Sequence, residues 1–354
     1  MSKEVMTSLT KSTYRKWLPA QQTGSEIGRK ALNLLWSARH PSEKYLLSPP
    51  MPTEKILYQT KDGWESYLLR IPPRSGKGVP VIISTGPILH PKHVLLSNRT
   101  LIDLLYRSGF DTYLFTHRGH RESRLLGSGS SMSFDAIVRE DVPCAIDSVK
   151  RNSHSQKVIW IGHGLGGCFL YGWLGSGGEL DIAAGVCLDS PVVFMEPRQP
   201  LSHGVWDWLH FNIPTETCGI FGSQFVQSKS NFPDQSLTPE ENRSLLYYGL
   251  SNISSDMVRQ MRIWHEEGIL CSADRKINYL SALKGNQTPL LVLAGTDTPL
   301  SKMDQTLAIL DHFPKDTPHH TGKWNLCPFI GQQSLSPCNK IVQWLKEYRK
   351  NCWL

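Results

Sequence analysis

The chain has 354 residues, of which 40% are hydrophobic and 19% charged, and its formal net charge is +7. This composition is typical of a globular protein, and the length suits one α/β domain with an inserted cap better than several small domains. No apolar stretch approaches the roughly 18–20 residues of a membrane-spanning helix. The basic residues are spread along the chain without a nucleic-acid-binding motif, so we expect no nucleic-acid partner.

Residues 1–54 are predicted to form a helical lead-in that ends in a proline-rich break. Its start lacks the apolar core of a secretory signal, and the eight cysteines form no CxxC pair. We therefore expect reduced thiols in a cytoplasmic protein, with no metal site and no cofactor. Because Trp17 and Trp36 alternate with basic residues, contact of this segment with a membrane surface or a protein is an alternative role.

The α/β core is predicted to occupy 55–189 and to resume at 286–354. Strands at 55–60 and 66–71 are joined by Lys61-Asp62-Gly63, which favours a hairpin. Apolar runs at 81–83, 112–115, 158–161, 182–188 and 290–293 predict buried strands, and helical spacing predicts helices at 99–108, 134–151 and 339–349. This alternation indicates a mostly parallel sheet flanked by helices. The strand pattern is lost at 190–285, where we expect a helical cap.

The strand predicted at 158–161 is followed by the sequence GHGLGG at 162–167 and then by a helix. This context resembles the nucleophile elbow of the α/β-hydrolase superfamily. The extra Gly167, the ISTGPIL stretch and the segment SNRTLIDLLYRSGFDTYLFTHRGH look like the lipase and poly(3-hydroxyalkanoate) synthase-like branch. The resemblance implies an α/β-hydrolase fold from about residue 55 to the C-terminus.

The resemblance places the family's nucleophile position on Gly164. Glycine has no side-chain oxygen or sulfur that could attack an acyl carbon, so the covalent step is expected to be absent. The elbow strains the backbone of a residue that has a Cβ, and glycine relieves that strain. A chain that does not need acyl chemistry would gain stability at this position.

The acid position is degenerate or shifted. Counting G-x-x-D from Gly295 reaches Thr298, with Asp297 one position early. Asp189, after the strand predicted at 182–188, occupies the other place where such folds keep an acid. A carboxylate that caps the following turn is the alternative interpretation of Asp189.

The resemblance places the histidine position on Asn325, counting back from Gly331. An asparagine amide does not titrate near neutral pH and cannot shuttle a proton. His319 and His320, on the upstream side of that loop, are the nearest imidazoles in the sequence. One of them could act as a base, or both could be ordinary surface residues.

Residues that follow predicted strands are candidates for a ligand site, since ligands of open α/β sheets gather at the carboxyl ends of the strands. His117, His120 and His163 hold such positions, and His163 could either do acid/base chemistry or pack under the cap. The resemblance also implies backbone oxyanion donors at Leu165 and near Ile88.

We therefore expect a non-hydrolytic α/β-hydrolase-fold protein with a degenerate catalytic triad. It would bind an apolar acyl, ester or polyketide-like ligand, or act as a scaffold for a partner. One alternative is an enzyme of non-classical mechanism, such as a lyase, cyclase or acyltransferase, that uses a pocket histidine and the oxyanion donors. Another is an interaction module that docks through its N-terminal segment.

Overall fold

The computed structural model describes residues 51–87, 89–95, 101–120, 122–127, 131–194, 237–238, 249, 251, 254–296, 301–324 and 328–352. All of them belong to one unit of the chain, Leu46–Leu354. The predicted lead-in lies outside the described residues except for 51–54, and the predicted cap at 190–285 is described only in part. No helix among the described residues is long and apolar enough to cross a membrane.

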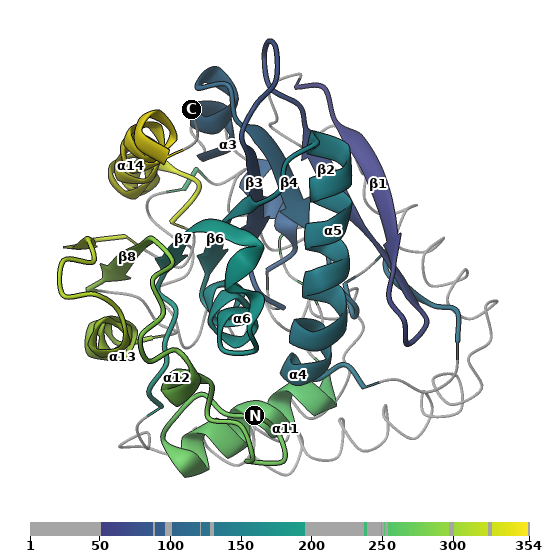
Figure 1. The fold of residues 1–354 in the computed structure, drawn as a ribbon, viewed down its shortest axis with the longest axis vertical. Helices are drawn as coiled ribbons and strands as arrows, with labels where there is room; N and C mark the ends of the chain where they lie inside the picture. The colour runs from purple at the N-terminus through teal and green to yellow at the C-terminus, as the bar shows by residue number, and fades with distance from the viewer. Residues whose placement is uncertain are drawn as a thin grey trace, which may run out of the picture. The chain divides into compact units, whose positions relative to one another are not determined.

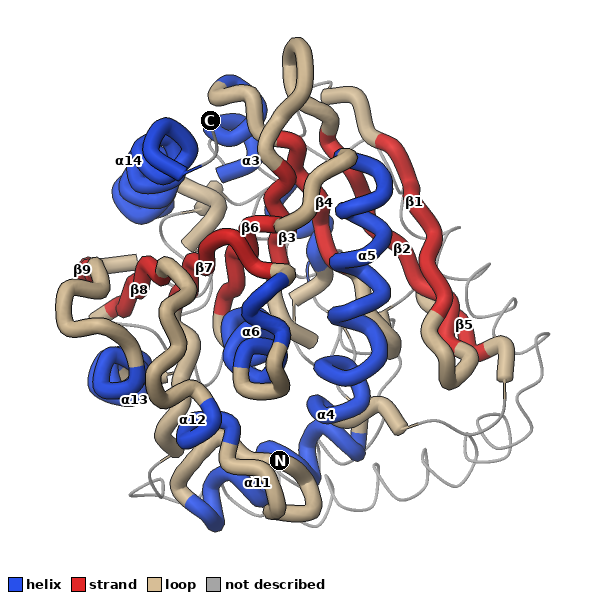
Figure 2. Tube along the Cα trace, viewed as in Figure 1, coloured by secondary structure: helices blue, strands red, loops and turns tan. Residues whose placement is uncertain are grey.

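The described residues contain one sheet in which the strands follow the order β1-β2-β4-β3-β6-β7-β8-β9, with β5 paired to β2. Figure 2 shows this order from β1 on the right to β9 on the left. The strands are β1 (Glu54–Gln59), β2 (Trp64–Ile71), β3 (Pro80–Ser84), β4 (Asp111–Phe115), β5 (Arg124–Leu125), β6 (Val158–His163), β7 (Ile182–Leu188), β8 (Leu290–Gly295) and β9 (His319–Gly322). β2 pairs antiparallel with β1, β4 and β5, and the pairs from β4 to β9 are parallel.

Helices cover both faces of this sheet (Figure 1). The described α-helices are α3 (Leu101–Arg107), α4 (Phe134–Ala136), α5 (Val142–Ser153), α6 (Leu165–Leu174), α11 (Ser255–Glu267), α12 (Tyr279–Ala282), α13 (Met303–Leu307) and α14 (Leu335–Cys352). Short 3₁₀ turns are η1 (Pro91–Leu95), η3 (Gly178–Leu180), η6 (Ala308–His312) and η7 (Gln332–Ser334), and η2 (Ile137–Asp141) is a π-helical turn.

Side chains along the central strands point alternately to the two faces of the sheet, and the hydrophobic core therefore consists of two clusters. Ile82 and Trp160 pack with α5 and α6, and α11 and α12 contribute to the same cluster. Ile83 and Ile161 pack on the other face with α3 and α14. Successive side chains of a strand point to opposite faces, so strands that are apolar at every position bury both faces of the sheet.

The predicted α/β architecture is confirmed, with two differences in detail. The helix predicted at 134–151 is interrupted by the π-helical turn η2 between α4 and α5. The strands β5 and β9 were not predicted, because β5 has two residues and β9 has the sequence HHTG, with no buried position. Hydrophobic periodicity gives no signal for a short, exposed strand.

Candidate functional site

The turn between β6 and α6 is centred on Gly164, which has φ 55° and ψ −125°. Its N–H donates to the Leu188 carbonyl oxygen at 2.8 Å, so the end of β7 holds the turn in place. A Cβ built on Gly164 would meet no described atom within 4 Å. A Cβ on Gly166 would collide with the carbonyl oxygen of Ser84 on β3. The turn is therefore tightly packed at Gly166, and no described residue fills the space beside Gly164.

The first residue of α6 is Leu165, the predicted oxyanion donor. The N–H groups of a first helical turn have no acceptor within the helix, and the helix dipole favours negative charge beside them. Leu165 therefore offers a backbone donor next to Gly164. The second predicted donor, near Ile88, lies outside the described residues.

His163 ends β6 and is 4% exposed. Its Nε2 lies 3.9 Å from Oδ2 of Asp189, and its Nδ1 has no hydrogen-bond partner among the described residues. Its ring meets Phe329 edge-on, with 5.7 Å between the centroids. Burial, with a contribution from the neighbouring His93, lowers the pKa of His163 to about 3. The imidazole is therefore neutral at pH 7.

Asp189 follows β7 with a left-handed φ of 48°. Its Oδ1 accepts the N–H of Gly295 at 2.7 Å, and its Oδ2 accepts Nε1–H of Trp324 at 2.7 Å. Burial raises the pKa of Asp189 to about 6, against the opposing effect of these two donors. The alternative interpretation, a carboxylate that caps the following turn, is wrong: the side chain joins β7 to the end of β8 and to the segment after β9.

The predicted pair His117 and His120 follows β4, and both side chains are buried. Their ring centroids are 3.9 Å apart, and that of His90 is 5.4 Å from His120. The carbonyl of His90 in turn faces Nδ1 of His93 at 2.9 Å. We call His90, His93, His117, His120 and His163 the histidine cluster.

Two members of the histidine cluster, His90 and His93, were missed by sequence reasoning. They follow the buried strand β3 just as His117 and His120 follow β4, so their place after a strand was an available signal. Among the described residues, no group of three or more His, Cys, Asp or Glu side chains is arranged to hold a metal ion.

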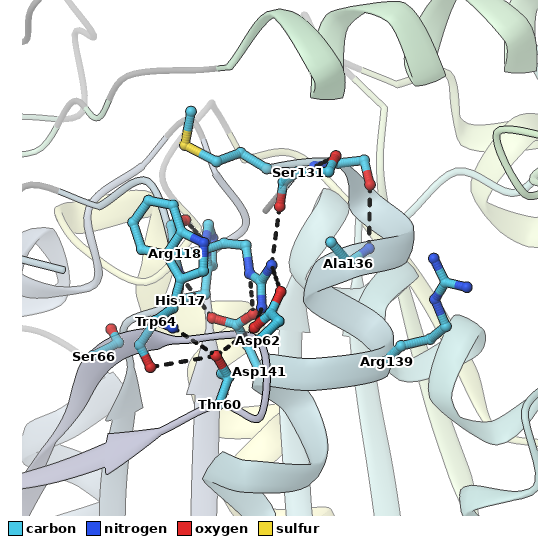
Figure 3. Close-up of polar contacts among 12 residues, drawn as sticks. Thr60, Asp62, Trp64, Ser66, His117, Arg118, Ser131, Ala136, Arg139 and Asp141 are labelled. Carbon is cyan, nitrogen blue, oxygen red and sulfur yellow. Dashed lines mark hydrogen bonds and ion pairs between the residues drawn. The ribbon is translucent and has the colours of Figure 1, made fainter. Parts of the chain in front are cut away.

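Arg118 lies between His117 and His120 in the sequence of the β4 loop, and its side chain is 1% exposed. Figure 3 shows its polar contacts. Its Nη atoms bond both carboxylate oxygens of Asp62 at 2.6 and 2.9 Å, and its Nε bonds Asp141. Its backbone N–H also donates to Asp141 at 2.8 Å. The guanidinium thus ties the β1–β2 hairpin, the π-helical turn η2 and the β4 loop together.

His319 and His320, for which a role as base and an ordinary surface position were both left open, lie on β9. His319 is exposed, and Nδ1 of His320 lies 3.4 Å from Nζ of Lys340. Burial, followed by the charge of Lys340, lowers the pKa of His320. β7 and β8 separate β9 from β6, a distance of about 14 Å across three strand spacings. The structure therefore does not bring these two histidines to Gly164.

The remaining predicted positions, Asp297, Thr298 and Asn325, lie outside the described residues. The described site lies where the parallel strands end, which we call the carboxyl edge of the sheet. It combines the glycine turn at 164, the N-terminus of α6, neutral imidazoles and the buried carboxyl group of Asp189. Such a set can bind a carbonyl oxygen and exchange protons. It offers no nucleophilic side chain at position 164.

Comparison with known proteins supports this architecture. Residues 92–321 match the family model Hydrolase_4, described as serine aminopeptidase, S33. A stretch of 132 residues is 28% identical to gastric triacylglycerol lipase of Mus musculus, and another match of 132 residues is 29% identical to lipase member K of Homo sapiens. Each match covers 32% of this chain and 33% of the lipase, so the similarity spans about one third of those relatives.

Solved structures show the same fold at low sequence identity. Naproxen esterase from Bacillus subtilis aligns with a TM-score of 0.55 at 13% identity, covering 89% of this chain and 96% of the esterase. Epoxide hydrolase VrEH1 from Vigna radiata aligns with a TM-score of 0.56 at 15% identity, covering 83% of this chain and 98% of the hydrolase. The family match extends over more than half of the sequence, and the sheet has the expected parallel core. The chain belongs to the Hydrolase_4 family of α/β-hydrolase-fold proteins.

Proposed function

We propose that this protein binds an apolar acyl or ester ligand at the carboxyl edge of its sheet and does not form an acyl-enzyme. The observation that carries the proposal is Gly164, which stands at the tight turn between β6 and α6 without a side chain. The packed glycine at 166 and the position of Leu165 as the first residue of α6 support retention of the turn as a binding element. In this proposal Asn325, Thr298 and Asp297 are the degenerate base and acid positions.

The similarity to lipases makes ester hydrolysis the outcome that must be tested. The experiment compares wild type, Gly164→Ser and Gly164→Ala against short and long p-nitrophenyl esters, with labelling by a fluorophosphonate. A serine hydroxyl at 164 would enter open space, so a lack of reactivity could not be explained by a steric clash with described atoms. The alanine variant adds the Cβ without the hydroxyl and is the matched control.

The proposal predicts that the wild type neither turns over the esters nor becomes labelled. Turnover by the wild type that is retained in an independently purified Gly164→Ala preparation would reveal hydrolysis by another group. Turnover or labelling only in Gly164→Ser would show that an acid and a base survive, and the assignment of Asn325 to the base position would be wrong.

A second candidate function is non-covalent acid/base catalysis by His163 and Asp189. It is favoured by the 3.9 Å separation between His163 Nε2 and Asp189 Oδ2 in a buried setting, and by Nδ1 of His163, which has no partner in the described part of the chain. A lyase, cyclase or acyltransferase reaction of this kind should show a pH-dependent rate that is lost in His163→Ala. The matched control is His319→Ala on β9, which should retain the rate.

A further inference from the structure

The charged residues in the described loops at the carboxyl edge constrain the charge of the ligand. Arg118 and Lys92 are cations of the loops after β4 and β3, and both are paired. Arg118 is held by Asp62 and Asp141 (Figure 3), and Nζ of Lys92 lies 2.5 Å from Glu122. Neither cation is left to neutralise a buried anionic ligand.

Four members of the histidine cluster do not replace these cations. Burial lowers the pKa of His93 and of His117 to about 4, and it lowers the pKa of His120 well below its ordinary value. Together with His163, these imidazoles are neutral at pH 7. Asp189 is the buried carboxyl group beside them, and the N–H groups of Gly295 and Trp324 already occupy its oxygens.

The buried ring nitrogens of the histidine cluster that have no hydrogen-bond partner among the described residues are Nε2 of His93, His117 and His120 and Nδ1 of His163. Neighbouring groups indicate the tautomers of His93 and His163. Nδ1 of His93 faces the His90 carbonyl oxygen at 2.9 Å. A carbonyl can only accept, so Nδ1 carries the proton and Nε2 holds a lone pair. Nε2 of His163 faces the Asp189 carboxylate, which favours the proton there and leaves the lone pair on Nδ1. His93 Nε2 and His163 Nδ1 have no hydrogen-bond partner among the described residues.

We propose that the ligand is an uncharged acyl compound that carries a hydroxyl or amide N–H group, and that the free carboxylic acid is rejected. This inference rests on the proposed function, because it names the ligand class of the same site. A donor on the ligand would satisfy the imidazole lone pairs, whereas a carboxylate would be buried beside Asp189, with Arg118 and Lys92 already paired to other carboxylates. The backbone N–H of Leu165, at the start of α6, would donate to the acyl carbonyl oxygen.

The test uses three probes with the same acyl chain: N-decanoylglycinamide, N-decanoylglycine and methyl decanoate. Their binding to the full-length protein is measured by isothermal titration calorimetry at pH 7.5. The amide should bind about 100-fold more tightly than the carboxylate, because the anion loses its hydration without gaining a cation. It should bind roughly 3- to 10-fold more tightly than the methyl ester, which has no donor.

Variants of His93 test whether Nε2 of this residue accepts a hydrogen bond from the ligand. His93→Leu should abolish the preference for the amide over the methyl ester, and His93→Gln should retain part of it because its side-chain oxygen also accepts. His319→Leu on β9 is the matched control and should keep the wild-type preference. Asp62→Asn removes one partner of Arg118 and should reduce the discrimination against the carboxylate several-fold.

The outcomes separate the two proposals. If the carboxylate binds as tightly as the amide, the inference about charge is overturned while acyl binding stands. If the methyl ester binds as tightly as the amide, or if His93→Leu leaves the preference unchanged, the inference about the donor is overturned. If none of the three probes binds, the proposed function itself fails and the inference fails with it.

Discussion

The indole Nε1–H of Trp324 donates a hydrogen bond to Oδ2 of Asp189 at 2.7 Å, and both side chains are buried. Because Oδ1 of the same carboxylate accepts the N–H of Gly295, one side chain fixes three segments at the carboxyl edge of the sheet. Asp189 therefore positions these three segments, whether or not it also takes part in catalysis.

Asp189→Asn should lower the free energy of unfolding by about 2–3 kcal/mol at pH 7.5, because an amide nitrogen cannot accept one of the two hydrogen bonds. Trp324→Phe should lower it by about 1–2 kcal/mol through loss of the donor. Urea unfolding of the single and double variants measures both effects. Strict additivity in the double variant would contradict a direct bond between the two side chains.

The two glycines of the elbow should differ in their tolerance of a methyl group. Gly164→Ala should lower the free energy of unfolding by about 1–3 kcal/mol, because φ is 55° but the space is open. Gly166→Ala should prevent normal folding or cost clearly more, because its Cβ would collide with the Ser84 carbonyl. Gly177→Ala is the control, with φ 89° and open space at a distant turn. Thermal unfolding ranks the variants, and an equal loss at 164 and 166 would refute the packing argument.

The Arg118 network should be necessary for folding stability. Arg118→Met should lower the free energy of unfolding by about 3–5 kcal/mol, because it leaves Asp141 as an uncompensated buried carboxylate. Arg107→Met, which breaks an exposed pair with Asp103 on α3, should change it by less than about 0.5 kcal/mol. Urea unfolding measures both values. Comparable losses in the two variants would show that burial does not determine the strength of the Arg118 network.

Acidification should destabilise the protein through its buried histidines. His93 and His163 have pKa values of about 4 and 3 in the fold, below the ordinary value of 6.5, so the unfolded chain binds more protons as the pH falls below 6.5. Each should reduce the free energy of unfolding by about 2 kcal/mol at pH 5 relative to pH 7.5. Urea unfolding between pH 4.5 and 7.5 measures the slope.

Two variants assign this pH dependence. His93→Gln should flatten the slope, because one fewer proton is taken up on unfolding. Asp189→Asn should steepen it, since the raised pKa of Asp189 makes the folded state bind a proton between about pH 4 and 6 and so opposes the histidines. A slope that neither substitution changes would rule out both groups as its source.

Local pattern in the sequence determined the sheet core, its covering helices and the elbow. The apolar runs that became β3, β4, β6, β7 and β8 bury both faces, and periodicity detects such strands directly. The Asp-Gly turn between β1 and β2 is likewise a local signal, and Gly63 adopts φ 94° there. The sequence alone places Gly164 at a turn between a strand and a helix, because both elements are its immediate neighbours in the chain.

Only the tertiary structure decided which polar groups meet at the carboxyl edge. Residues 163, 189 and 324 come together because parallel strands end at the same edge, and no period in the sequence records such a contact. Sequence proximity made His319 and His320 possible bases, yet β9 places them three strand spacings from β6. Likewise, Arg118 and Asp62 lie 56 positions apart, and burial makes their pairing necessary, because an unpaired charge in the interior is unfavourable.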